Sequence, residues 1–261
     1  MLTNSSFTLQ RMRARVARFR GVACPLGLPP QFPMTAAPPP PSTEVIALEA
    51  ADGQTRALGD QVLLLVARMD AGEREKGHRE LIAVMPAILA RYPGAQLVFA
   101  GDGSDLADLR TLAAASPAAA SLFLTGRASD DLLKALYGKA LAFVMPSRQE
   151  GFGLVYLEAM NYAKPCLACR DDGGADVVVD GETGLLVSRA VEPDELFAAL
   201  DRLLADPALA HRLGEAGWRR LVQDFSAAAH QKRMVSFLRP LLPPGPRQAP
   251  AGPIIPPARY S

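Results

Sequence analysis

The sequence predicts an α/β protein built on a doubly wound parallel sheet, with a group of helices at its C-terminal end. Apolar runs of strand length alternate with amphipathic stretches between residues 61 and 187. Continuous apolar strands are typical of parallel sheets covered on both faces, and strands that alternate with helices imply right-handed βαβ crossovers. Beyond residue 190 the pattern is helical, with apolar residues recurring at a helical spacing.

The expected elements follow one another without long gaps. The first strand, at residues 61–67, is a continuous apolar run after its first residue. Ser129 is placed to cap the N-terminus of a later helix. Further strands are expected at residues 96–100, 122–125, 141–145, 165–169 and 184–187, and helices at residues 81–90, 106–114, 130–137, 154–162, 175–179, 194–204, 207–222 and 227–238.

Two proline-dense stretches divide the chain. Residues 29–60 begin with clustered prolines, which remove hydrogen-bond donors and fix φ, so a linker is expected there. Residues 241–261 are again rich in proline and are expected to be disordered. The main folded domain is therefore predicted to span residues 61–240, with residues 1–28 as a separate preceding segment.

The composition excludes several classes of protein. The 28 Lys and Arg residues nearly balance the 27 Asp and Glu residues, so nothing indicates nucleic-acid binding, and membrane contact would be peripheral at most. No apolar run approaches the roughly 20 residues that span a bilayer. Three cysteines do not make a disulfide framework, which favours the cytoplasm, and Cys166 and Cys169 are interpreted as buried structural thiols. A transit peptide in the arginine-rich residues 1–20 is the alternative for that segment.

Two cations follow the first predicted strand. Ligands of an open parallel sheet bind beyond the carboxyl ends of its strands, so this edge carries the candidate chemistry. Arg68 follows the strand, and Lys76 precedes the next helix together with Gly77. A planar guanidinium fork and a compact ammonium group at one edge suit a diphosphate. The alternative is that both are solvated surface cations.

Two carboxylates, Glu150 and Glu158, follow the fourth predicted strand. Gly151 and Gly153 stand between them, directly before a helix. Glycines let the backbone approach a ligand closely, and the start of a helix favours phosphate. One carboxylate can then reach a sugar and the other a ribose, with phosphates between them. The alternative is that Glu158 faces solvent on its helix.

Residues 150–158 read Glu-Gly-Phe-Gly-Leu-Val-Tyr-Leu-Glu, which resembles the E-x7-E signature of retaining glycosyltransferases with two facing Rossmann-like domains, the GT-B architecture. The group concerned includes glycogen, sucrose and lipopolysaccharide mannosyl- and glucosyltransferases. Further matches, in the family's order, are Arg68 with Lys76-Gly77, residues 99–103, residues 124–126, and Gly173-Gly174 with residues 180–184. The resemblance covers residues 61–240 and implies a Rossmann-like donor-binding domain.

The resemblance also implies roles for single residues. The donor substrate would be a nucleotide-diphosphate sugar, with no cofactor and no metal, and the sequence contains no Asp-x-Asp. Arg68 and Lys76 would hold the diphosphate as it leaves, and Glu150 would contact the transferred hexose. The other implied contacts are the backbone of Gly151, Phe152, Gly153 and Leu154 at hexose and phosphate, Glu158 at the ribose, and Gly126, Arg127 and Leu132 around the base.

The chain departs from the family pattern in three places. Asp176 stands where Glu is common, and Ala67 stands where Gly is common. The third departure is that residues 1–28 resemble only the closing segment of the acceptor-binding domain. A sugar or lipid-linked acceptor would then be bound by a separate partner chain, or by a domain that truncation has removed, at the inner face of the membrane or in the cytoplasm. The alternatives to a transferase are a non-catalytic nucleotide-sugar-binding or partner-supporting module and a nucleotide-sugar epimerase.

Overall fold

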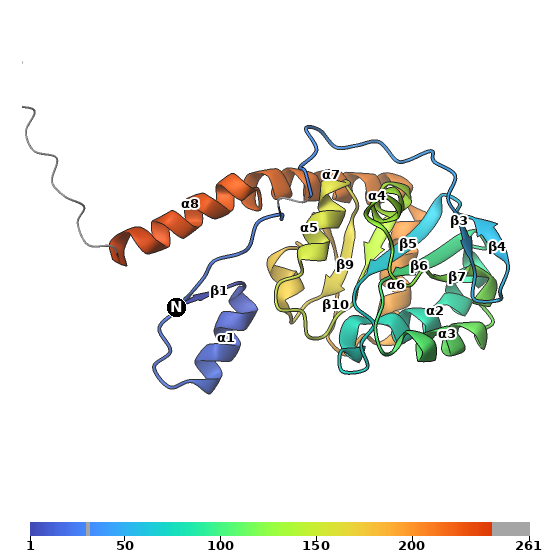
Figure 1. The fold of residues 1–261 in the computed structure, drawn as a ribbon, viewed down its shortest axis with the longest axis horizontal. Coiled ribbons are helices and arrows are strands. Elements are labelled where there is room, and N and C mark those ends of the chain that lie inside the picture. The colour runs from blue at the N-terminus through green and yellow to red at the C-terminus, as the bar shows by residue number, and fades with distance from the viewer. Residues whose placement is uncertain (30–31, 242–261) are drawn as a thin grey trace, which may run out of the picture.

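The computed structural model describes residues 1–29 and 32–241 (Figure 1). Its centre is a six-stranded sheet in the order β10-β9-β8-β5-β6-β7, and every neighbouring pair is parallel. The strands are β5 (Gln61–Val66), β6 (Ala95–Ala100), β7 (Leu122–Leu124), β8 (Ala142–Val144), β9 (Cys166–Cys169) and β10 (Gly184–Val187). The predicted doubly wound parallel sheet is therefore confirmed.

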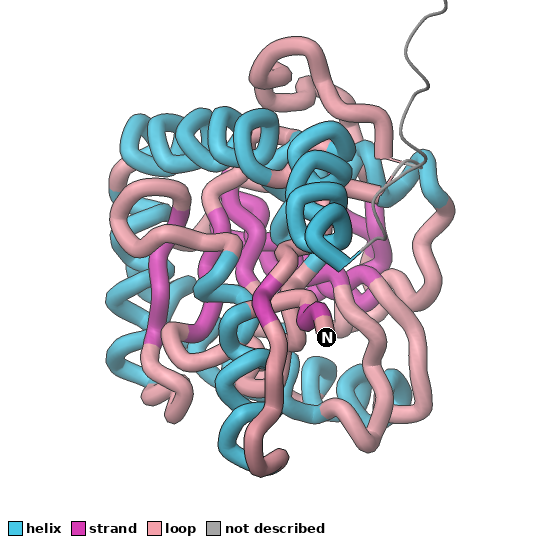
Figure 2. The backbone as a smooth tube through the Cα atoms, turned by 90° about the vertical axis from the view of Figure 1, so that its left-hand side faces the viewer, coloured by secondary structure: helices cyan, strands magenta, loops and turns pink. Residues whose placement is uncertain are grey.

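Helices cover both faces of this sheet (Figure 2). They are α2 (His78–Arg91), α3 (Leu106–Ala114), α4 (Asp130–Lys139), α5 (Leu154–Asn161), α6 (Pro193–Ala205), α7 (Pro207–Asp224) and α8 (Ala227–Leu238). Right-handed crossovers place α2 and α3 on one face and α4 and α5 on the other, because the winding direction reverses after β7. Helix α6 packs on α2, and α7 packs on α5. The C-terminal helices thus complete both layers.

The strands are apolar because neither face of the sheet meets water. The side chains from Val62 to Leu65 in β5 are fully buried, as is Phe143 in β8. Cys166 and Cys169 are buried in β9 and are not joined by a disulfide. Their interpretation as structural thiols is therefore confirmed. The predicted cap also forms, since Ser129 Oγ accepts a hydrogen bond from the Leu132 amide at 3.2 Å.

Several short elements lie outside those expected from the sequence. Before the linker these are β1 (Leu2–Thr3), α1 (Ser6–Arg15) and β2 (Val22–Ala23), and within it they are the hairpin of β3 (Ala47–Glu49) and β4 (Thr55–Ala57). The 3₁₀ helix η3 (Gly173–Asp176) stands in place of a helix at residues 175–179. Three further 3₁₀ turns are η1 (Arg74–Lys76), η2 (Ala119–Ser121) and η4 (Arg239–Leu241). The Ala51 amide donates to the Leu122 carbonyl at 2.8 Å, so the hairpin borders the edge of the sheet at β7. The tail expected from residue 241 lies, beyond that first residue, outside the described residues.

None of the helices in the described part of the chain has both the length and the apolar character that crossing a membrane requires. The longest, α7, carries arginines along its length and contacts α5, α6 and α8. Its apolar residues are therefore used for packing within the domain.

Close contact between α7 and the α5–β9 turn makes Gly214 sensitive to substitution. A Cβ at Gly214 would lie 1.9 Å from the Ala163 carbonyl oxygen, whereas a Cβ at Gly72 would meet nothing within 4 Å. We expect Gly214→Ala to lower the free energy of unfolding by about 1–3 kcal/mol, because α7 must move away. Urea unfolding measures this, with Gly72→Ala as the control, and equal stability of the two variants would contradict the packing described.

Candidate functional site

The loops after β5 and β8 meet in one cavity of about 360 Å³. These two strands are neighbours in the sheet although the chain visits β6 and β7 between them, so the strand order reverses here. Such a switch point leaves a crevice beyond the carboxyl ends of the strands. The cavity brings together seven of the predicted site residues, namely Arg68, Lys76, Glu150, Gly151, Phe152, Gly153 and Leu154.

Lys76 and Glu150 form an ion pair across this cavity. Lys76 Nζ lies 2.8 Å from Glu150 Oε2, and the two side chains are only 17% and 19% exposed. Gly77 follows Lys76 with a φ of 92°, and a Cβ there would lie 2.6 Å from Pro146 Cγ. A glycine at this position therefore lets the two loops approach closely enough for the ion pair to form.

Arg68 occupies the rim of the cavity. Its side chain is 71% exposed and pairs with Asp70 at 3.5 Å and with Glu73. Glu73 also lines the cavity. An exposed ion pair of this kind contributes little to stability and can exchange partners readily. Arg68 thus lines the same cavity as Lys76 while its guanidinium remains exposed.

The backbone between β8 and α5 forms another wall of the cavity. Gly153 is the N-cap of α5 and has a φ of 91°, a conformation that favours glycine. Gly151, Phe152 and Leu154 also line the cavity. The first backbone N–H groups of a helix have no partners within the helix, so the start of α5 offers hydrogen-bond donors to an anion.

Glu158 is buried and does not line this cavity. It is 8% exposed, and its Oε2 accepts a hydrogen bond from the Tyr137 hydroxyl at 2.9 Å. Burial raises the pKa of Glu158 to about 7, and the hydrogen bond from Tyr137 opposes the rise. The alternative of a solvent-facing Glu158 is therefore wrong. The side chain lies between α5 and α4, one helical turn beyond Leu154.

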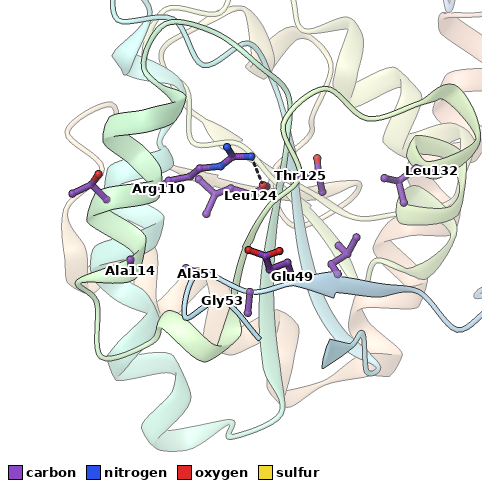
Figure 3. Close-up of a pocket in the computed structure, with 11 residues that line it drawn as sticks. Glu49, Ala51, Gly53, Arg110, Ala114, Leu124, Thr125 and Leu132 are labelled. Atoms are coloured by element: carbon purple, nitrogen blue, oxygen red, sulfur yellow. Dashed lines mark hydrogen bonds between the residues drawn. The ribbon is translucent and has the colours of Figure 1, made fainter. Parts of the chain in front are cut away.

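The residues that were predicted to surround the nucleotide base lie beside a second cavity of about 740 Å³ (Figure 3). Leu132 lines it together with Thr125, after which Gly126 and Arg127 follow directly in the chain. Arg110 of α3 also lines this cavity and donates to the Leu124 carbonyl at 3.4 Å. Figure 3 shows Arg110 and Leu132 on opposite sides of this space, with the carboxylate of Glu49 also directed into it. The two cavities have no lining residue in common.

Two features of the first cavity were not identified from the sequence. Asn4 and Leu26 line it, and the Thr8 hydroxyl donates to the Gly151 carbonyl at 3.3 Å, so the N-terminal segment contributes a wall. Asp172 accepts from the Glu150 amide at 3.1 Å. Only the position of Asp172 directly before a Gly-Gly pair could have drawn attention to it.

Both positive charges of the cavity come from side chains. Among residues 1–29 and 32–241, no group of three or more His, Cys, Asp or Glu side chains is arranged to hold a metal ion. Lys76 and Arg68 line one cavity, and two cations in one cavity suit a ligand with anionic groups. The arrangement suits an anionic ligand with a polar, hydroxyl-bearing part near Glu150.

Comparisons with known proteins agree on one family. Residues 50–220 match the family model described as Glycosyl transferases group 1. The glycogen synthase of Mycobacterium tuberculosis is 34% identical over 167 residues, which cover 64% of this chain and 39% of that protein. A GDP-mannose-dependent alpha-(1-6)-phosphatidylinositol monomannoside mannosyltransferase of Mycolicibacterium smegmatis is 31% identical over 189 residues, covering 69% and 48%. The chain thus spans less than half the length of either relative.

The fold of the chain resembles that of a solved structure. Sucrose-phosphate synthase from Thermosynechococcus elongatus superposes with a TM-score of 0.71 and 26% sequence identity, covering 92% of this chain and 57% of that one. The family model and the M. smegmatis relative each cover enough of the chain to establish its family membership.

Because burial raises the pKa of Glu158, the free energy of unfolding should depend on pH. The folded pKa of about 7 compares with an ordinary pKa of 4.5, so the stabilising contribution of the protonated carboxyl is complete below pH 4.5 and is lost as the pH rises through 7. Relative to Glu158→Gln, the wild type should lose about 3 kcal/mol of unfolding free energy between pH 4.5 and pH 8. Denaturant unfolding at both pH values measures the difference. Glu182→Gln, at an exposed position, is the control, and a pH-independent difference for Glu158→Gln would refute the assignment.

Proposed function

Because the chain belongs to the glycosyl transferases group 1 family, we propose that it binds a nucleotide-diphosphate sugar and serves as the donor-binding part of a retaining hexosyltransferase. The observation that carries this proposal is the Lys76–Glu150 ion pair, with Arg68 at its rim, in the crevice at the switch point of the sheet. One cavity thus holds two cations that suit a diphosphate and a carboxylate that suits sugar hydroxyls, which supports the proposal.

The diphosphate binds to Arg68, Lys76 and the start of α5. Transfer of the hexose leaves a nucleoside diphosphate on which negative charge develops, so groups that stabilise this charge accelerate the reaction. A guanidinium fork and an ammonium group supply the compensating positive charge without a metal ion. Arg68 can turn from Asp70 and Glu73 toward the phosphates because its ion pairs are exposed.

The hexose lies against Glu150 and the turn that follows it. A carboxylate accepts hydrogen bonds from two neighbouring hydroxyls of a sugar, and the backbone of Gly151 and Gly153 leaves room for the ring. The ion pair with Lys76 holds the Glu150 carboxylate in the cavity before the donor arrives. The acceptor hydroxyl then attacks the anomeric carbon on the face from which the diphosphate departs. The bond between that carbon and the diphosphate oxygen breaks and the hydroxyl proton passes to the departing diphosphate, so the configuration is retained.

The ribose and base extend from the phosphates toward α4. Glu158 accepts hydrogen bonds from the ribose hydroxyls. Its buried carboxyl accepts them in place of the bond from the Tyr137 hydroxyl or in addition to it. The base lies at the mouth of the second cavity, bordered by Gly126, Arg127 and Leu132. Leu132 and Thr125 form the wall of the cavity there. The donor therefore spans the sheet edge from β8 to β7.

The acceptor is a sugar or a lipid-linked hydroxyl bound by a part of the enzyme that faces this cavity. The M. smegmatis relative is named for a phosphatidylinositol monomannoside acceptor, which supports the lipid-linked class. A separate partner chain that carries the acceptor-binding domain is one arrangement that completes the site. In this arrangement, the nucleoside diphosphate is released only when acceptor and partner are both present.

Removal of either cation tests the proposal. Arg68→Ala and Lys76→Ala should each raise the Kd for a nucleotide sugar about 10- to 100-fold, because each removes charge-assisted hydrogen bonds to the diphosphate. Isothermal titration with UDP-glucose, GDP-mannose and ADP-glucose measures the change.

The matched control is Lys134→Ala, which removes an exposed cation of α4 whose partner is Asp131. It should leave the Kd unchanged. Binding of the same affinity in wild type, Arg68→Ala and Lys76→Ala would show that the diphosphate lies elsewhere, and the proposal would fail.

A further inference from the structure

A single carboxylate holds the backbone of Glu150. Asp172 lies between β9 and η3 and is 2% exposed. Its Oδ2 accepts the Glu150 amide at 3.1 Å, and its Oδ1 accepts the Gly174 amide at 2.7 Å. The Gly173 amide in turn donates to the Glu150 carbonyl at 2.8 Å. Both backbone polar groups of Glu150 are therefore bound to one turn.

This turn fits against the Glu150 loop with no free space. A Cβ at Gly173 would lie 2.4 Å from the Gly151 carbonyl carbon and oxygen, and 2.7 Å from the Glu150 oxygen. A Cβ at Gly174 would lie 2.9 Å from both Asp172 Oδ1 and Tyr156 Cε2. The two backbones are thus in direct contact, and the position of Glu150 depends on the position of the turn.

We propose that Asp172 is a positioning residue for the donor sugar, because it fixes the backbone of Glu150 so that the Glu150 carboxylate meets both Lys76 and the hexose. This inference rests on the proposed function, in which Glu150 contacts the transferred sugar. Asp172 itself touches neither the donor nor the acceptor. It acts through the loop that it anchors.

A carboxylate suits this position better than an amide does. An ionised carboxylate accepts one N–H on each oxygen, whereas Asn has one acceptor oxygen and an NH₂ group that repels a second N–H donor. Burial raises the pKa of Asp172 to about 7, although the hydrogen bonds from the Gly174 and Glu150 amides act to lower it. Asn has nearly the same shape as Asp and keeps one acceptor oxygen, so Asp172→Asn should fold and lose its hold on one of the two amides.

The test compares Asp172→Asn with Asp171→Asn, a change at the adjacent exposed position. Titration calorimetry gives the Kd of UDP, GDP and ADP and of UDP-glucose, GDP-mannose and ADP-glucose. We expect Asp172→Asn to bind the nucleoside diphosphate within about twofold of wild type, because Arg68 and Lys76 are unchanged. The ratio of the nucleotide-sugar Kd to the nucleoside-diphosphate Kd should rise about 10-fold or more, as a charge-assisted hydrogen bond is lost.

Amide hydrogen exchange supplies a readout that does not need a ligand. The Glu150 amide should exchange faster in Asp172→Asn than in Asp171→Asn, while the amides of β5 exchange equally in both. An unchanged Kd ratio, or unchanged exchange at Glu150, overturns the positioning role. If none of the six nucleotides binds to the wild type, the proposed function fails and the inference fails with it. If they bind and the two variants agree, only the inference fails.

Discussion

The reversal of strand order between β5 and β8 is the constraint on which the rest of the site depends. Helices leave these two strands in opposite directions, α2 to one face and α5 to the other, so no element fills the space beyond their ends. Lys76 enters this space from the β5 side and Glu150 from the β8 side. Neither residue alone makes a site. The sheet topology makes them neighbours although 74 residues separate them in the chain.

The site is held in place by close contacts with the backbone of its loops. Gly77 lies against Pro146, Gly173 lies against Gly151, and the Glu150 amide binds Asp172. Side chains larger than hydrogen at these glycines would separate the loops. Close backbone contact leaves little freedom for the side chains that project from it, so Lys76 and Glu150 are oriented before a ligand arrives. Such preorganisation reduces the entropy lost on binding.

Most of the fold could be predicted because its signals are local. The strands are continuous apolar runs, and β10 and α3 begin and end at the predicted residues. The hairpin of β3 and β4 was missed because its six strand residues are half-buried or exposed and form no apolar run. The meeting of Arg68 and Lys76 in one cavity could be predicted, because both follow the first strand of the sheet and lie at its carboxyl end. The burial of Glu158 depends on Tyr137 of α4, and the role of Asp172 depends on a turn 22 residues from Glu150, so neither could be derived from neighbouring residues.

The turn that anchors Glu150 also binds the N-terminal segment. Asp176, at the end of η3, accepts from both the amide and the hydroxyl of Ser6, and Thr8 reaches the Gly151 carbonyl. Helix α1 is therefore attached to the Glu150 loop along two short routes, one through η3 and one directly. A rigid-body shift of α1 would act on η3 and on the Gly151 carbonyl together, and η3 lies against the Glu150 loop. The segment that precedes the linker is therefore mechanically coupled to the cavity that holds Lys76 and Glu150.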